Sequence, residues 1–167
     1  MSDLKLDDQL CFALYSASRA AVAAYRPVLN ELDLTYPQYL VMLVLWEEGE
    51  STVAHLGRRL QLDSGTLSPL LKRLELIGYV QRSRSRVDER SVTVLLTELG
   101  SELRDRAECV PSTIFDAVAH SAGPDGTVPG AEDIAALRLA LHHIASVLRG
   151  TDSGDKDSGD AGETTTA

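Results

Sequence analysis

With 167 residues, 44% of them hydrophobic, the chain suits one domain with a real core, and its two cysteines are too few for a disulfide framework or a metal site. No apolar run approaches the roughly 20 residues of a membrane span, and no signal peptide opens the sequence, so we expect a cytoplasmic protein without metal or cofactor. The net charge of −9 argues against nucleic acid as a partner until the positions of the charges are considered.

Residues 7–30 are predicted to form a long helix, because apolar residues recur there at alternating steps of four and three. Asp7 or Asp8 is expected to cap its start. A second helix is predicted for residues 37–48. It is apolar on nearly all sides, so we expect it to be buried throughout.

Two shorter helices follow, with a turn at residues 61–65 between them. The first is expected to be capped by Ser51 or Thr52 and to end at residue 60. The second is expected over about 65–77, with leucines on its inner face and a glycine directly after it. By length and by patterning this is a helix-turn-helix.

From Tyr79 to Thr97 the apolar period changes to two, which predicts a β-hairpin with its tip at residues 87–90. A hairpin directly after a recognition helix is a wing. The segment 55–90 also carries eight Lys or Arg against four Asp or Glu. This local excess of base fits a phosphate backbone, although a solvated surface with a chance excess of base is the alternative.

Another long helix is predicted after Thr97, then a Gly/Pro-rich break and a last helix over about 131–149. The predicted fold class is mainly α with a small β wing, a winged helix-turn-helix. Its N- and C-terminal helices have larger apolar faces than a small winged core can cover, so we expect them to form the dimerisation region of a homodimer. Residues 1–150 are the predicted domain, with the DNA-binding part at about 36–97, and 151–167 are a predicted disordered acidic tail.

Four stretches resemble a known family. Residues 65–75 and the wing sequence 88–90 look like MarR-type transcription regulators. The blocks 6–15 and 34–40 resemble the narrower OhrR branch, whose members repress an organic-hydroperoxide resistance gene until a cysteine is oxidised. The resemblance covers about residues 6–148 and implies a repressor that releases a pseudo-palindromic, A·T-rich operator on oxidation.

The resemblance identifies Cys11 as the redox-sensing residue. The reactive form of a cysteine is the thiolate, and Cys11 lies about one turn into the predicted first helix, where the helix dipole favours negative charge and nearby acids partly cancel it. In the OhrR branch two tyrosines contributed across the dimer support the thiolate, and the matching positions are Tyr25 and Tyr36. Tyr15, one turn on from Cys11, is a further candidate. Apolar neighbours of Cys11 favour an alkyl or lipid hydroperoxide.

Cys109 is a possible resolving cysteine. In two-cysteine members of the branch the resolving residue follows a segment like 110–115, and here that position is Asp116. Cys109 precedes the segment and is expected on the polar side of its helix, with Asp105 and Ser112. We therefore expect one-cysteine behaviour, in which the sulfenic acid passes to a small thiol.

The resemblance places the recognition helix in the major groove and the wing tip in the minor groove, where A·T tracts concentrate negative potential. Short side chains at the helix start would approach base edges, and basic ones would bind phosphates or guanines. At the tip Arg90 would enter the minor groove, with Asp88 as its internal partner. The predicted contacts are Ser64, Gly65, Thr66, Ser68, Lys72, Arg73, Arg84, Arg86, Asp88 and Arg90.

Two other functions stay open. One is a MarR-type regulator released by a phenolic or other small ligand, with Cys11 merely structural. Release of DNA by hydroperoxide, and not by aromatic acids, separates it from the sensor. The other is a thiol peroxidase, which would have no use for a wing or a basic helix. The resemblance favours a regulator and no enzyme.

Overall fold

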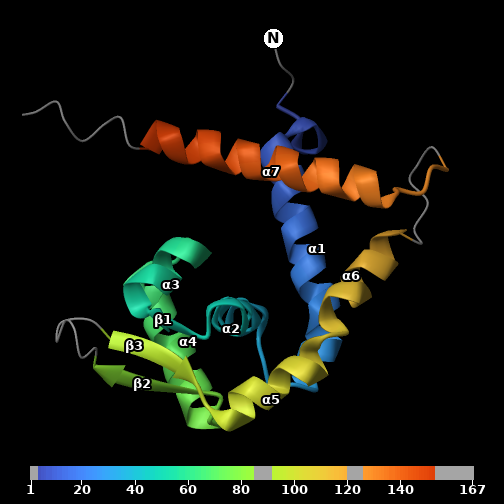
Figure 1. Cartoon of the computed structure of the whole chain (residues 1–167). Helices are drawn as coiled ribbons and strands as arrows, with labels where there is room; N and C mark the ends of the chain where they lie inside the picture. The colour runs from blue at the N-terminus through green and yellow to red at the C-terminus, as the bar shows by residue number, and fades with distance from the viewer. Residues whose placement is uncertain (1–3, 85–91, 120–125, 153–167) are drawn as a thin grey trace, which may run out of the picture. The chain divides into compact units, whose positions relative to one another are not determined.

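The computed structural model describes residues 4–84, 92–119 and 126–152. The chain divides into two compact units, residues 1–115 and 116–167. The first unit contains a helix-turn-helix and a small sheet, and the second contains the last helix (Figure 1).

The chain begins with a short 3-10 helix, Leu6–Asp8, and α1 follows at Leu10–Asn30. The helix predicted for 7–30 is confirmed, but its first turn is this separate 3-10 helix. Gln9, and neither aspartate before it, stands at the N-cap of α1. Leu29 alone is buried among the residues of α1, all of which the structure describes. Much of the apolar side of α1 therefore lies open in a single chain.

The next helix, α2 at Tyr36–Glu48, forms the centre of the core. Its start is fixed by a capping box in which the amide of Thr35 donates to Oε1 of Gln38 at 2.8 Å. Gly49 ends it at φ +81°, a backbone conformation that favours glycine. The expectation that this helix is buried throughout holds except on one side, where Leu43 reaches the surface.

The predicted helix-turn-helix is confirmed as α3 at Val53–Leu60 and α4 at Ser64–Ile77. Thr52 caps α3, because its side-chain oxygen accepts a backbone amide at 3.1 Å. A short strand, β1 at Glu50–Thr52, precedes α3, and no pattern in the sequence indicated it.

The wing strands are β2 at Val80–Arg84 and β3 at Val92–Leu96. Together with β1 they form an antiparallel sheet in the order β1-β3-β2 (Figure 1). Val94 of the central strand pairs with Ser51 of β1 and is fully buried. The wing is thus joined to the helix-turn-helix through its own sheet. The tip predicted at 87–90 lies outside the described residues.

The core joins α2, α3, α4 and the sheet with the helix that follows it. Its fully buried side chains include Val41, Met42, Leu45, Leu56, Leu71, Leu74 and Val94. These residues come from α2, from both helices of the helix-turn-helix and from the wing strand β3. The mainly α fold class with a small β wing is therefore confirmed.

The single helix predicted after Thr97 is two helices, α5 at Glu98–Ala107 and α6 at Val110–Ala119. Pro111 lies in the first turn of α6, where its missing amide proton breaks no helical bond. Leu103 and Ala107 of α5 are buried in the core, whereas Leu99 is 49% exposed. The break therefore ends the helix that covers the core, and the next helix begins at Val110, which is still buried in that core.

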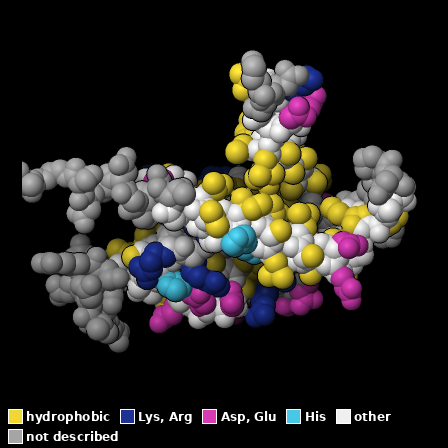
Figure 2. Space-filling view, turned by 90° about the horizontal axis from the view of Figure 1, so that it is seen from above, with side chains coloured by type: hydrophobic (Ala, Val, Ile, Leu, Met, Phe, Trp, Pro, Cys, Tyr) yellow, Lys and Arg dark blue, Asp and Glu magenta, His cyan; other side chains and the backbone are white. Residues whose placement is uncertain are grey.

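The second unit contains α7 at Ala131–Asp152, which extends past its predicted end at residue 149. Several large apolar side chains of α7 are exposed in the single chain, Leu137 to 58%. Hydrophobic side chains also gather on the face of the molecule drawn in Figure 2. None of the described helices is long and apolar enough to cross a membrane. Residues 153–167 of the predicted tail lie beyond the described residues.

Candidate DNA-binding face and thiol site

The start of α4 is fixed by Asp63, the residue before it. The amide of Thr66 donates to the Asp63 carboxylate at 2.8 Å, and the Thr66 hydroxyl donates to it at 3.0 Å. These hydrogen bonds hold the pKa of Asp63 below its usual value. Asp63 is therefore the cap, and Ser64 is the first residue of the helix.

One side of α4 is buried and the other is open. Leu67, Leu71 and Leu74 enter the core. On the open side Ser64, Ser68 and Lys72 recur at steps of four, so they form one row along the helix. The predicted contacts on α4, which are Ser64, Gly65, Thr66, Ser68, Lys72 and Arg73, are all exposed.

The basic residues of segment 55–90 differ in their surroundings. Arg82 of β2 is held by Glu75 of α4, with Nε donating to Oε2 at 2.9 Å. This ion pair lowers the pKa of Glu75. The charge of Arg82 is thus partly neutralised by Glu75. A count of the basic residues in segment 55–90 therefore overstates the positive charge that is available to a ligand.

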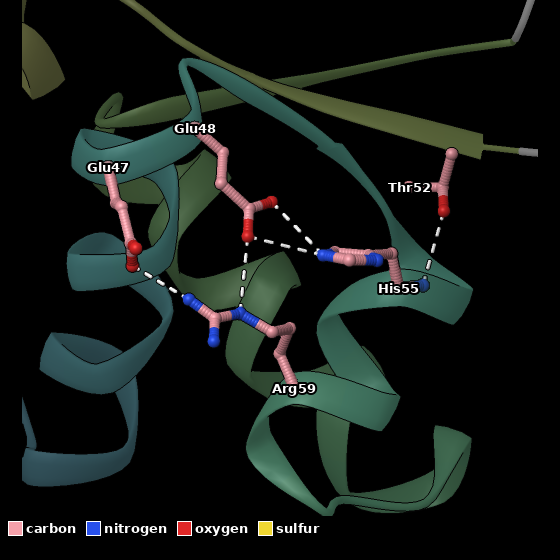
Figure 3. A network of polar contacts seen from close by, with 5 residues as sticks. All are labelled: Glu47, Glu48, Thr52, His55 and Arg59. Carbon is pink, nitrogen blue, oxygen red and sulfur yellow. Dashed lines mark hydrogen bonds and ion pairs between the residues drawn. The ribbon is translucent and has the colours of Figure 1, made fainter.

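A second network joins the end of α2 to α3 (Figure 3). Nη2 of Arg59 lies 2.7 Å from Oε2 of Glu47, and Nε of Arg59 lies 3.2 Å from Oε1 of Glu48. His55 contacts Glu48 at 3.2 Å, and this contact is the largest cause of the lowered pKa of Glu48. Sequence reasoning gave His55 no role, since its partner is seven residues away on another helix.

The predicted wing contacts can be followed only in part. The backbone of Arg84 at the end of β2 pairs with Val92 of β3. Arg86, Asp88 and Arg90 lie outside the described residues. The contacts predicted for Arg86, Asp88 and Arg90 therefore stay predictions.

Cys11 is the second residue of α1 and is exposed. It therefore lies closer to the helix N-terminus than the sequence suggested, among the first amides that have no acceptor within the helix. The two aspartates before it belong to the separate 3-10 helix. The thiol at this position is open to an oxidant from solvent.

The tyrosines predicted to support the thiolate form a cluster at the other end of α1. The rings of Tyr25 and Tyr36 lie 4.9 Å apart, and Tyr39 lies 6.1 Å from Tyr25. Burial raises the pKa of Tyr25, and it raises the pKa of Tyr39 to about 12 with help from the neighbouring tyrosines and Cys109. These phenols therefore keep their protons and can donate hydrogen bonds. Sequence reasoning missed Tyr39.

Cys11 and the tyrosine cluster are not brought together within one chain. Fourteen residues separate Cys11 from Tyr25 along α1, and at 1.5 Å per residue this is roughly 21 Å. Tyr15 lies near Cys11, but its hydroxyl accepts a hydrogen bond from Arg19 at 3.2 Å. A phenol from this cluster could reach Cys11 only from a second copy of the chain.

Cys109 lies at the junction of α5 and α6 and is exposed. Its sulfur lies 3.7 Å from the carbonyl oxygen of Arg106, to which it donates. Its charge would also raise the pKa of Tyr39, so it lies within electrostatic reach of the tyrosine cluster. Cys109, which the sequence predicted on the polar side of its helix, therefore lies close to one aromatic residue of the core, Tyr39.

Two grooves of the first unit concern these sites. One, of about 520 Å³, lies between α2 and the α5–α6 junction, and Tyr39, Leu43 and Trp46 line it. The other, of about 880 Å³, lies between α3, α4 and the wing strands. Within the described part of the chain, no group of His, Cys, Asp or Glu could hold a metal ion.

A model of the SarA/Rot transcriptional regulators matches residues 23–107. The chain is 44% identical over 145 residues to the organic hydroperoxide resistance transcriptional regulator of Bacillus subtilis, covering 87% of this chain and 92% of that one. It is 56% identical over 109 residues to the regulator TtmR of Methylorubrum extorquens, covering 65% of this chain but only 56% of TtmR.

Among solved structures, the chain resembles reduced AbfR bound to DNA, a protein of Staphylococcus epidermidis. The TM-score is 0.70 at 32% identity, covering 89% of this chain and 96% of AbfR. The SarA/Rot family, the Bacillus subtilis protein and TtmR are transcriptional regulators.

Proposed function

Because the chain belongs to the SarA/Rot-type family of MarR-like winged-helix transcriptional regulators, we propose that it is a repressor that senses organic hydroperoxides through Cys11. The observation that carries this proposal is the exposed thiol of Cys11 at the N-terminus of α1. Oxidation of that thiol would release the operator and derepress a peroxide-resistance gene. The family consists of regulators, so a thiol peroxidase is not proposed.

The reaction needs only the thiolate and the hydroperoxide. The Cys11 sulfur attacks one peroxide oxygen, an S–O bond forms as the O–O bond breaks, and the leaving alkoxide takes up a proton to become an alcohol. The sulfur is oxidised to a sulfenic acid and the hydroperoxide is reduced. The attack requires the thiolate form of Cys11.

A homodimer would complete the site. Tyr25 and Tyr36 of one chain cannot reach its own Cys11, but a second copy could offer its phenols to that thiolate. The exposed apolar side chains of α1 support such an assembly, since Leu10 is 61% exposed in the single chain. Hydrogen bonds from protonated phenols stabilise an anion. The role proposed for Tyr25 and Tyr36 is to donate such hydrogen bonds to the Cys11 thiolate of the other copy.

The surroundings favour an apolar oxidant over hydrogen peroxide. Phe12 and Leu14 flank Cys11 and are half-buried. The groove lined by Leu43 and Trp46 continues from the tyrosine cluster through Tyr39. An alkyl or lipid chain gains from apolar contact that small polar hydrogen peroxide cannot make.

DNA would be read by α4 and the wing. Ser64 and Ser68 would approach base edges in the major groove, and Lys72 on the same row would bind phosphate or guanine. Gly65, Thr66 and Arg73 lie at the same open surface. At the wing, Arg84 and Arg86 would bind phosphate, and Arg90 held by Asp88 would enter the minor groove. A dimer suits a pseudo-palindromic, A·T-rich operator.

The test is DNA binding by fluorescence anisotropy on the region upstream of the chain's own gene, with and without cumene hydroperoxide. We expect the unmodified protein and Cys109→Ser to release DNA, and Cys11→Ser to bind normally and stay bound. An added aromatic acid should have no effect. If Cys11→Ser dissociates under oxidant, or the aromatic acid alone releases DNA, Cys11 is not the sensor.

A further inference from the structure

Two adjacent arginines of α3 have opposite surroundings. Arg59 is engaged by Glu47 at 2.7 Å and by Glu48 at 3.2 Å (Figure 3). Arg58 is exposed, and its side chain has no hydrogen-bond or ion-pair partner among the described residues. The charge of Arg59 is neutralised by glutamates of the same chain, whereas the charge of Arg58 is available to a binding partner.

Arg58 faces the same groove as the recognition helix. The groove of about 880 Å³ between α3, α4 and the wing strands is lined by Arg58 together with Ser64 and Ser68 of the open row on α4. Whatever approaches this open row from outside therefore also approaches the guanidinium of Arg58.

The charges around the groove favour an anion. Its described lining residues include Arg58 and Arg82 and no Asp or Glu, in a chain whose net charge is −9. Arg82 is already paired with Glu75, and Asp63 beside the groove is engaged by Thr66. Of the two described cations that line the groove, Arg58 is thus the free one. A guanidinium binds phosphate oxygens in a planar, charge-assisted geometry.

We propose that Arg58 binds a backbone phosphate of the operator, so that α3 contributes a contact in addition to those of α4 and the wing. The contact lies where the open row of α4 would meet the duplex, and it fixes how that helix sits over the bases without reading them. It rests on the proposed DNA-reading role of α4 but not on the chemistry of Cys11.

The experiment compares Arg58→Ala with Arg59→Ala in the reduced full-length protein. Affinity for operator DNA is measured over roughly 50–200 mM salt, because each phosphate contact contributes about 0.9 to the slope of log K against log salt. Because each subunit of the proposed dimer would supply one contact, we expect Arg58→Ala to lower the slope by about two and the low-salt affinity by at least about tenfold. Arg58→Lys should restore most of the slope.

Arg59→Ala is the matched control, since it removes the same charge one residue away. It should leave the salt slope unchanged and lower the unfolding midpoint, because it breaks the pairing with Glu47 and Glu48. An unchanged slope in Arg58→Ala would overturn the proposal. So would benzoate that displaces DNA from the unmodified protein but not from Arg58→Ala, since the groove would then hold a small carboxylate. Arg58→Gln repeats the comparison if the alanine variant melts early.

Discussion

Tyr39 lies close to several aromatic and thiol groups of the candidate thiol site. Its ring lies 6.1 Å from Tyr25 and 6.3 Å from Trp46, and its pKa responds to Cys109. Nothing in the sequence distinguishes it from other buried aromatic residues of an apolar helix, so only the packing of α1 against α2 reveals it. Tyr25 and Tyr36 were found because they match positions of a known branch, not because their spacing places them together.

A substitution of Tyr36 tests the proposed donation to the thiolate. Tyr36→Phe removes the hydroxyl and keeps the ring that stacks on Tyr25. A hydrogen bond to a charged group contributes about 1.5–3 kcal/mol, so we expect thiol oxidation by cumene hydroperoxide to slow at least about tenfold. The measurement is the rate at which the free thiol of Cys11 disappears in a Cys109→Ser background.

Tyr79→Phe is the control for this prediction. Its hydroxyl donates to the carbonyl of Leu32 at 3.1 Å, so the change also removes one buried hydroxyl. We expect a loss of about 1 kcal/mol of stability and an unchanged oxidation rate. Equal rates for Tyr36→Phe and the unmodified protein would exclude Tyr36 as a donor.

The sulfenic acid formed at Cys11 can pass to a small thiol or to Cys109. Cys109 lies near the aromatic cluster, but a disulfide needs Cα atoms within about 7 Å. The Cys109 sulfur also donates to the carbonyl oxygen of Arg106 at 3.7 Å, and it would have to give up this contact to attack an oxidised Cys11. We therefore expect no covalent dimer when one equivalent of hydroperoxide is added without small thiol, as seen on a non-reducing gel. A dimer band that disappears in Cys109→Ser would show that Cys109 resolves the oxidised thiol.

Among the elements, those with a clear apolar period could be predicted from the sequence. The leucines of α4 follow from one face being buried, whereas the apolar stripe of α1 predicted its helix although most of that stripe lies open in the single chain. The stops were predictable as well, since Gly49 and Gly78 adopt positive φ at the ends of α2 and α4. The local sequence was therefore sufficient to predict an element that buries one continuous face.

Other elements depend on distant partners and could not be predicted. The strand β1 has three residues and exists because it pairs with β3, more than 40 residues later. The break between α5 and α6 falls inside an unbroken apolar stripe, so periodicity alone predicted one helix. The groove that Arg58 shares with α4 likewise needs tertiary structure.

Helix α5 approaches the chain at Tyr79 closely through Gly100. A Cβ on Gly100 would lie 1.9 Å from the carbonyl oxygen of Tyr79. Gly100→Ala must therefore push α5 away from the core, and we expect a loss of at least about 1–3 kcal/mol in the free energy of unfolding. Urea denaturation measures it.

Gly150→Ala is the matched control. Gly150 lies within α7, and a Cβ added there would meet no other described atom within 4 Å. The same substitution there should be neutral or stabilise by about 0.5–1 kcal/mol. Equal midpoints for the two variants would contradict the close contact at Gly100.

For the whole molecule, charge is separated along the chain. The net charge is −9, yet the open surface of α3 and α4 carries Arg58, Lys72 and Arg73, for which no acidic partner is found in the described part of the chain. Arg59 is paired with Glu47 and Arg82 with Glu75, so these two arginines add little free positive charge to that surface. Acidic residues elsewhere repel phosphate, so they favour approach through this one face.

The C-terminal segment contributes to that repulsion. Beyond Asp152, where α7 ends, the sequence carries four acids against Lys156 and no large apolar residue. Removing residues 153–167 should therefore leave dimerisation and the response to hydroperoxide intact, because this segment has little apolar surface to bury. Operator affinity should rise severalfold at low salt and return to that of the full chain at high salt, where such long-range repulsion is screened. Anisotropy titrations at both salt concentrations measure this, with a full-length variant carrying amides in place of the four acids as control. That variant should behave like the truncation, because the effect lies in the charge and not in the length of the segment. A truncated protein that is monomeric or blind to hydroperoxide would instead assign the segment a structural role.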